Sequence, residues 1–327
     1  MEEQETKSLR VLSLYERLCK GDLLIKKDEA ERFDVHEKTI QRDLETLRLY
    51  LEKNDGGTTT LEYNRAKKRY SLSRKSEVWL TKEEILALGK VLLETRAFLK
   101  KEMDTLLDKV IRHSEPSDRK VIRDVISNEQ HYYEPLKHGR SLLQMIWDIS
   151  DAVRTKKLLE ISYQKETAEE AVTRTVKPVG VLFSEYYFYL AAFSVKYDFE
   201  SPTIYRMDRI TNYTILKEHF KVDEKDRFEE GEFRQQIQFM QSGPLMNLVF
   251  RFTGSSIQAV EDRLPTATKL SEDEHGTVFE AKVFGKGVKM WLLSQGPYVE
   301  VLKPVEFRDE MKRSLEEMLG RYGGNRE

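Results

Sequence analysis

The chain has 327 residues, of which 34% are charged, and its formal net charge is −2 at pH 7. The length allows about two to four domains, and the near-neutral charge gives no sign that the whole surface binds a polyanion. One cysteine, Cys19, excludes an internal disulfide and a cysteine-cluster metal site, and the six histidines show no ligand spacing. Without a membrane-spanning apolar run or a signal peptide, we expect a cytosolic protein with no cofactor or metal.

The segment from Phe33 to Leu51 predicts a DNA-reading helix. Wound as a helix from about His36, it places four apolar side chains on one face: Ile40, Leu44, Leu47 and Leu51. The opposite face carries four long polar side chains: Lys38, Gln41, Arg42 and Glu45. A short helix over Lys27–Phe33 and a tight connection precede it, which predicts a helix-turn-helix whose second helix enters the major groove.

Two flanking segments complete a first domain over residues 1–75. Ser8 to Lys20 predicts an amphipathic helix with this buried face: Val11, Leu12, Tyr15, Leu18 and Cys19. Residues 58–63 and 68–72 read as two strands around residues 64–67, which predicts a hairpin wing. Six basic residues and no acidic one lie in and after its tip: Arg65, Lys67, Lys68, Arg69, Arg74 and Lys75. The domain is therefore predicted to be a winged helix-turn-helix.

Residues 76–140 predict a helical connector. Thr81 and Glu84 form a capping-box pattern, helical periodicity runs from Glu83 to about Ile111 with a break near Leu99, and a further helix covers residues 117–126. Another helix is predicted from about residue 140 to 155.

From residue 158 the apolar period changes to two, with Leu159, Ile161 and Tyr163 alternating with polar residues. Short strands are predicted over residues 173–177, 180–183, 186–195, 203–209 and 213–216, so residues 141–222 predict a small Sm/SH3-like β-barrel. Residues 223–241 read as a hinge or an exposed helix. Residues 242–327 show a β-α-β-β-α-β order with a terminal helix, which predicts a ferredoxin-like domain and makes the whole chain α+β and multidomain.

Three stretches together resemble one family, the WYL-domain-containing bacterial transcriptional regulators. TIQRDLETL (residues 39–47), followed by KKRYSL (residues 67–72), is similar to a DeoR-like DNA-binding domain. Phe188-Tyr189-Leu190 resembles the Trp-Tyr-Leu triplet of the WYL domain, with RTVKP from Arg174 and YRMDRI from Tyr205 as flanking marks. MWLLSQGPYVEVLKP (residues 290–304) resembles the C-terminal extension of that domain.

The resemblance covers nearly the whole chain except the helical connector, and it implies a ligand sensor that forms homodimers. Some WYL domains bind nucleic acid or nucleotides. Two positions depart from the family pattern. Phe188 replaces the usual Trp and lacks its N–H donor, and His36 stands where Ser or Thr usually precedes the recognition helix.

The first group of candidate site residues faces DNA. Lys38, Gln41 and Arg42 are placed to reach base edges or phosphates, since Arg suits guanine and Gln suits adenine. Thr39 on the helix flank, and Lys67, Lys68 and Arg69 in the wing, suit phosphate contact. Asp43 lies beside the apolar stripe, where we expect it to orient an arginine or a backbone amine. The alternative is a solvated helix face.

The second group of candidate residues is predicted to bind an anionic ligand in the barrel, either a short single-stranded nucleic acid or a nucleotide. Arg174, Arg206 and Arg209 are expected to line one basic pocket, because guanidinium groups pair with phosphate. Aromatic rings that stack on bases are expected at its edge: Tyr163, Tyr187, Phe188 and Tyr189. The alternative is a structural ion pair between Arg206 and Asp208, with the rings as barrel core.

These patterns favour a ligand-responsive transcriptional regulator that binds double-stranded operator DNA as a homodimer, with repression and activation both open. The alternative is a nucleic-acid processing enzyme, or a scaffold for single strands, that uses the barrel. An enzyme is the weaker reading, because the sequence has no glycine-rich phosphate loop, nucleophile elbow or metal-spaced cluster.

Overall fold

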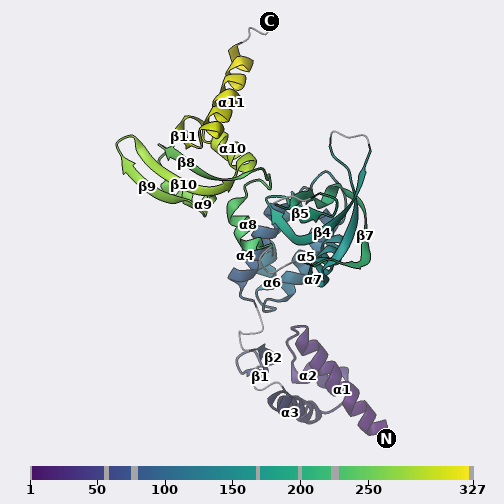
Figure 1. Cartoon of the computed structure of the whole chain (residues 1–327). Coiled ribbons are helices and arrows are strands. Elements are labelled where there is room, and N and C mark those ends of the chain that lie inside the picture. The colour runs from purple at the N-terminus through teal and green to yellow at the C-terminus, as the bar shows by residue number, and fades with distance from the viewer. Residues whose placement is uncertain are drawn as a thin grey trace. The chain divides into compact units, whose positions relative to one another are not determined.

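The computed structural model describes residues 2–54, 59–74, 80–166, 170–197, 201–221 and 228–323. The chain divides into two compact units, Met1–Pro135 and Leu136–Glu327. Figure 1 shows the elements of each unit, coloured from purple at the N-terminus to yellow at the C-terminus. Within the described residues, no helix has both the length and the apolar character needed to cross a membrane.

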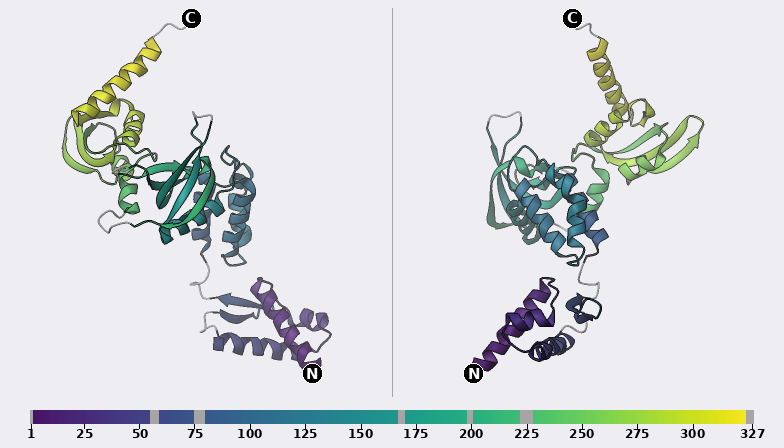
Figure 2. Two further views of the ribbon diagram at one scale, coloured as in Figure 1. Left: turned by 45° about the vertical axis from the view of Figure 1, so that its right-hand side comes forward. Right: turned by 180° about the vertical axis from the view of Figure 1, so that it is seen from behind.

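The first unit begins with three helices and a hairpin, the element order of a winged helix-turn-helix. They are α1 (Glu2–Cys19), α2 (Lys26–Arg32), α3 (Glu37–Asn54), β1 (Thr59–Asn64) and β2 (Arg69–Arg74). The apolar stripe of α3 is buried as expected, in a core shared with α1 and the hairpin. Figure 2 shows the dark blue hairpin beside these helices, and α1 contacts β2 while α3 contacts β1.

The buried face of α1 differs from the one expected. Leu14 and Leu18 are buried, whereas Leu12 is 60% exposed and Cys19 is only half-buried. The helix turns Arg10 inward in line with these two leucines, and Arg10 is only 8% exposed. A charged side chain occupies the core face here because a carboxylate of α3 compensates its charge, a contact that hydrophobic periodicity does not reveal.

Three more helices complete the first unit: α4 (Lys82–Thr95), α5 (Lys100–Arg112) and α6 (Arg119–His131). Thr81 caps α4, and the side chain of Glu84 accepts a hydrogen bond from the Thr81 amide, so the expected capping box is present. The expected break falls at residues 96–99, where Arg96 is left-handed with φ 53°. The three helices share an apolar core of their own.

The second unit begins with α7 (Leu143–Thr155) and an antiparallel sheet of five strands in the order β6-β5-β4-β3-β7. The strands are β3 (Lys157–Tyr163), β4 (Val172–Ser184), β5 (Tyr187–Ser194), β6 (Thr203–Arg206) and β7 (Ile210–His219). Helix α7 packs against one face of the sheet. In the described residues β6 and β7 are edge strands that do not pair with each other, so the expected closed barrel is an open sheet there.

Two expected strands form one long strand, β4, whose register with β5 shifts between Pro178 and Gly180. Pro178 pairs with β5, but the pairing of β4 with β3 ends at Val176. The missing N–H of Pro178 therefore breaks no hydrogen bond to β3. The strand expected over residues 203–209 ends at Arg206, and a 3-10 turn, η1 (Met207–Arg209), leads directly into β7.

The acidic segment after the sheet contains α8 (Glu230–Gln236), while residues 222–227 lie outside the described residues. It is not the exposed helix that was one expectation, since Phe233 and Ile237 are buried. These side chains join a core that includes Leu182 and Ala191 of the sheet and Phe284 of the following domain. This core joins the sheet to the C-terminal domain within the second unit.

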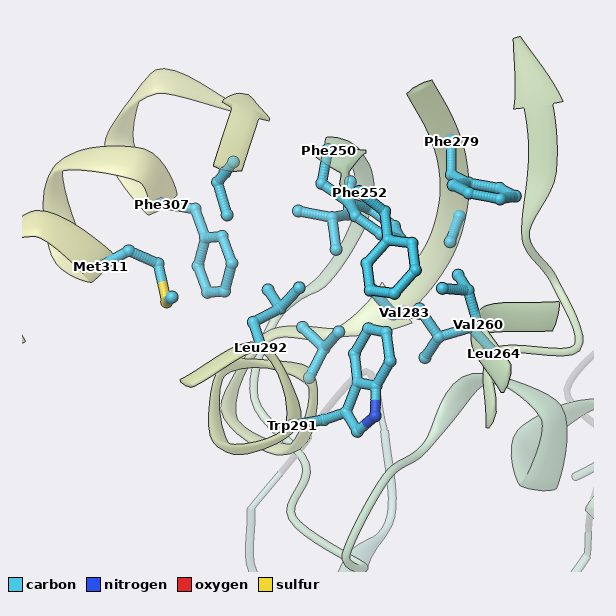
Figure 3. Packing of buried hydrophobic residues seen from close by; sticks show 14 residues of the cluster. Phe250, Phe252, Val260, Leu264, Phe279, Val283, Trp291, Leu292, Phe307 and Met311 are labelled. Carbon is cyan, nitrogen blue, oxygen red and sulfur yellow. The ribbon is translucent and has the colours of Figure 1, made fainter. Parts of the chain in front are cut away.

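The C-terminal domain follows the expected β-α-β-β-α-β order. Its elements are β8 (Leu245–Phe252), α9 (Ile257–Arg263), β9 (Thr268–Asp273), β10 (Gly276–Phe284), α10 (Gly285–Ser294), β11 (Val299–Lys303) and the terminal α11 (Val305–Gly323). The sheet order is β11-β8-β10-β9. Figure 3 shows Trp291 and Leu292 of α10, with Phe307 of α11, packed toward Phe250 and Phe252 of β8.

Candidate nucleic-acid interface and sensor site

Helix α3, which the sequence predicts to be a recognition helix, separates a buried face from an exposed one. Ile40 and Leu44 are almost fully buried, whereas Lys38 and Arg42 are exposed and Thr39 is half-buried on the flank. No hydrogen bond from the Lys38 or Arg42 side chains is found among the described residues. The helix therefore presents two exposed cations on the side away from its core, a geometry suited to phosphates and base edges.

Asp43 connects α3 to α1 through an ion pair. Its carboxylate accepts a hydrogen bond from Nε of Arg10 at 2.5 Å, and both side chains are buried. This agrees with the expectation that Asp43 orients an arginine rather than touching DNA. The contact fixes α3 to α1 and leaves the exposed face free.

Gln41 lies in a different environment from its neighbours on the polar face. It is half-buried, and its Oε1 accepts hydrogen bonds from Nζ of Lys26 and from the hydroxyl of Tyr70, both at 3.0 Å. Its Nε2 donates to Glu45 at 3.2 Å. The amide expected to read adenine is thus engaged within the protein.

The hairpin loop carries an exposed basic cluster: Arg65, Lys67, Lys68 and Arg69. Asn64 begins the loop by accepting a hydrogen bond from the Lys67 amide, and Lys68 ends it at φ 51°. Arg74 belongs to β2 but its side chain is not described, and Lys75 lies outside the described residues. Within the described residues, none of these four cations forms an ion pair with a carboxylate. They are therefore available for phosphate contact.

In the five-stranded sheet, Arg206 and two of the expected rings share one face. Arg206 pairs with Tyr189 across β6 and β5, and Tyr187 lies two residues before Tyr189. The guanidinium stacks on the Tyr187 ring at 3.5 Å from its centroid. It also donates two hydrogen bonds to the carboxylate of Asp208, at 3.1 and 2.7 Å. The ion pair considered as a structural alternative is therefore formed.

Arg174, Tyr163 and Phe188 lie on the other face. Arg174 pairs directly with Ile161, and Ile161 lies in the core against α7. Leu190 lies in the same core, so its neighbour Tyr189 points to the opposite face. Because successive residues of a strand alternate between faces, Arg174 and Arg206 point to opposite sides of the sheet. Tyr163 and Phe188 pack partly into the same core. The structure does not bring the three expected arginines into one pocket.

Arg209 lies in the η1 turn, where its guanidinium donates to the exposed Glu166 at 2.6 Å. A fourth arginine reaches the same turn: Nη1 of Arg140 donates to the carbonyl oxygens of Asp208 and Ile210, at 2.9 and 2.7 Å. Arg140 and Arg206 therefore both bond to Asp208 of η1, while Arg209 of the same turn bonds outward to Glu166. The sequence gives no signal for Arg140, because its partners lie about 70 residues further along the chain.

Burial sets the protonation of these groups. It raises the pKa of the Tyr189 hydroxyl to about 12, although the charge of Arg206 acts in the opposite direction. Burial also works to lower the pKa of Arg206, but the hydrogen bond and charge of Asp208 outweigh it, so that pKa is raised. At neutral pH the site therefore offers a phenol that can donate and a permanent cation. No group of three His, Cys, Asp or Glu residues in the described chain is placed to hold a metal ion.

Two regions of the second unit match known domain families. Residues 144–215 match the WYL domain, and residues 244–319 match the WCX domain. The second unit therefore contains a WYL domain followed by a WCX domain, and Phe188-Tyr189-Leu190 lies within the residues that match the WYL domain.

Comparison with curated proteins gives no match. Among solved structures, proteasome accessory factor B/C (PafBC) of Arthrobacter aurescens is 16% identical, with a TM-score of 0.33, over 92% of this chain and 46% of that chain. A CRISPR Cas-related protein is 18% identical, with a TM-score of 0.40, over 75% of this chain and 72% of that chain. This chain thus spans less than half the length of the PafBC chain, and neither likeness carries an argument about function.

Proposed function

We propose that this WYL-domain protein is a ligand-responsive transcriptional regulator that binds double-stranded operator DNA through α3 and the hairpin wing. One observation carries the proposal: α3 holds Lys38 and Arg42 exposed on the face opposite its buried stripe, beside an exposed basic loop. Helix-turn-helix proteins insert such a helix into the major groove. Thr39 and the loop cations Lys67, Lys68 and Arg69 would contact phosphates, and Arg42 would read a base.

The sensor in this proposal is the η1 turn of the WYL domain. Arg140 and Arg206 bond to Asp208 of this turn, and Arg209 of the turn bonds to Glu166, so three arginines are set against two carboxylates. The excess of positive charge and the rings of Tyr187 and Tyr189 favour an anionic effector with bases, a nucleotide or a short single-stranded nucleic acid. Arg174, Tyr163 and Phe188 lie on the other face of the sheet. They would not contact the effector and would influence its binding only through the packed core.

A homodimer belongs to the same proposal. Helix-turn-helix readers bind two half-sites about 10–10.5 bp apart, or a multiple of that spacing, through the two-fold symmetry of a dimer. A dimer of this protein would therefore select an inverted repeat. Light scattering on the full chain would show twice the mass of one chain.

The first experiment is selection from random-sequence duplex DNA by the full-length protein. The proposal expects enrichment of an inverted repeat over the starting pool. Absence of any enriched sequence, together with tighter binding of single-stranded than of double-stranded DNA, would instead favour a single-strand scaffold or a processing enzyme that uses the WYL domain.

The second experiment tests the sensor with the enriched duplex. Nucleotides and short oligonucleotides are added to the complex, and DNA release is followed by fluorescence anisotropy. An anionic effector should change DNA affinity in the wild type and lose most of that effect in Arg209→Ala. A matched control is Arg154→Ala, which removes a similarly paired surface arginine on α7. If the effector changed DNA affinity equally in the wild type, Arg209→Ala and Arg154→Ala, the effector would bind at another site.

A further inference from the structure

Gln41 joins three elements of the DNA-binding region. It belongs to α3, its Oε1 accepts from Lys26 of α2, and the same oxygen accepts from the hydroxyl of Tyr70 of β2. Its Nε2 faces Glu45, one turn further along α3. Tyr70 is 5% exposed, so nearly all of this residue lies within the protein, and its hydroxyl bond to Gln41 is partly buried.

The chemistry of the partners fixes the orientation of this amide. A lysine ammonium group is a donor only, so the atom that meets Lys26 must be the amide oxygen. With Tyr70 as a second donor, both lone pairs of Oε1 are used. The remaining amide group, Nε2, then donates a hydrogen bond to the carboxylate of Glu45.

This arrangement conflicts with a base-reading role. A glutamine that reads adenine accepts from N6 with its oxygen and donates to N7 with its nitrogen. Gln41 could do so only by releasing Tyr70 and Lys26, which would leave the buried Tyr70 hydroxyl without a partner. An unsatisfied buried polar group is destabilising, so adenine binding would have to offset that loss.

We propose that Gln41 is a positioning residue: it fixes the wing against the recognition helix through Tyr70 and does not read a base. The inference rests on the proposed DNA-binding function. It leaves Arg42, exposed on the adjacent position of α3, as the base-reading residue.

The main chain around Tyr70 supports the same role. Its amide and carbonyl both bond to Leu24, at 2.8 and 2.9 Å, and Leu24 lies just before α2. The ring also packs at 4.6 Å from that of Tyr63 on β1. Tyr70 thus ties both strands of the hairpin to α2 and α3, and Lys67 and Lys68 of the wing tip lie only a few residues before it.

The test compares Tyr70→Phe, Gln41→Ala and the double variant in the full chain, with Tyr63→Phe as the control that removes a hydroxyl from the same hairpin. Each protein selects from random-sequence duplex DNA, and its affinity for the enriched duplex is measured at several salt concentrations. We expect both single variants to keep the wild-type base preference at every position. Each should bind about three- to tenfold more weakly, the cost of one hydrogen bond, and the double variant no more weakly than either.

The opposite pattern would overturn the proposal. If Gln41→Ala relaxed the preference at one base position while Tyr70→Phe left preference and affinity unchanged, Gln41 would be a base reader. Affinity losses that add in the double variant would also contradict a shared contact.

A second readout separates this inference from the proposed function. Hydrogen exchange in the DNA-free protein should become faster over residues 59–74 in Tyr70→Phe and Gln41→Ala, but not in Tyr63→Phe. Unchanged exchange would overturn the positioning role. If the wild type enriched no DNA sequence, the proposed function would fail, while the exchange rates would still decide whether Gln41 holds the wing.

Discussion

Arg10 and Asp43 form a buried ion pair between α1 and α3, with Nε of Arg10 at 2.5 Å from Oδ2 of Asp43. The exposed fractions of the two side chains are 9% and 1%. The other carboxylate oxygen of Asp43 is buried without a hydrogen-bond partner among the described residues. The pair fixes the helix whose opposite face carries Lys38 and Arg42.

Removing one member of this pair should be strongly destabilising. Asp43→Ala leaves the guanidinium of Arg10 buried without its counter-charge, so the free energy of unfolding should fall by about 3–5 kcal/mol. The matched control is Asp108→Ala, which breaks an exposed pair with Arg123 at 3.1 Å and should cost about 0.2–1 kcal/mol. Urea unfolding of both variants checks the difference, and equal losses would contradict the structural importance of the Arg10 contact.

The wing should supply affinity without sequence preference. Lys67→Gln removes one exposed cation at the loop tip, so the slope of log K against log salt should become smaller by about 0.9 if Lys67 contacts a phosphate. Binding should weaken equally for the enriched duplex and for a scrambled duplex. Lys312→Gln on α11 is the control with the same charge change on an exposed side chain. If Lys67→Gln and Lys312→Gln changed the slope of log K against log salt equally, the DNA would not contact the wing.

The two arginines that flank Asp208 should differ in their effect on stability. Arg206→Ala removes the stacking on Tyr187 and leaves Asp208, whose side chain is 5% exposed, without its counter-charge. The expected loss in the free energy of unfolding is about 2–4 kcal/mol, below that of a fully buried pair because Arg206 is 25% exposed. Arg209→Ala loses a partner that is 79% exposed and should cost less than about 1 kcal/mol. Thermal or urea unfolding that ranks them in reverse would show that the Arg206–Asp208 pair is not structural.

Tyr213 should make the protein less stable at high pH. Burial, with a hydrogen bond donated to Asp148 at 2.7 Å, raises the pKa of its hydroxyl to about 12, against about 10 in the unfolded chain. Because the folded state holds this proton more tightly, the contribution is fully present below pH 10 and is lost as the pH rises toward 12.

Tyr213→Phe should therefore reduce the fall in the free energy of unfolding between about pH 10 and pH 12. Tyr322→Phe, at a tyrosine that is 88% exposed, should leave that pH dependence as in the wild type. Urea unfolding across this pH range makes the comparison. Identical slopes for the wild type and Tyr213→Phe would show that the hydroxyl is not held by Asp148.

Local patterns in the sequence predict much of this fold. The spacing of Ile40, Leu44 and Leu47 gives the buried face of α3, and the Thr81–Glu84 pattern gives the start of α4. These features depend on residues within one or two helical turns of each other. The buried face of α1 was predicted only in part: Leu18, Val11 and Tyr15 pack in the core, but Leu12 is exposed. Arg10 was missed because its partner Asp43 lies 33 residues away.

The candidate sites were less predictable because they depend on long-range pairing. Alternation alone does not place Arg174 and Arg206 on opposite faces, since the register of β4 changes near Pro178 and Gly180. The partners of Gln41 are likewise distant, with Tyr70 lying 29 residues further along the chain. Residue type identified these side chains as candidates, but only the fold distinguishes those that are exposed from those engaged in internal contacts.

The most direct measurement is the ratio of affinities for the enriched duplex and a scrambled duplex, made with the wild type, Arg42→Ala and Arg48→Ala in the full chain. Arg48 is exposed on the same helix, so both substitutions remove one positive charge from α3. The account predicts that Arg42→Ala lowers the ratio roughly 5- to 150-fold, equivalent to about 1–3 kcal/mol, and relaxes the preference at one base position, while Arg48→Ala leaves the ratio unchanged. An unchanged ratio in Arg42→Ala, or equal losses in both variants, would contradict base reading by the exposed face of α3.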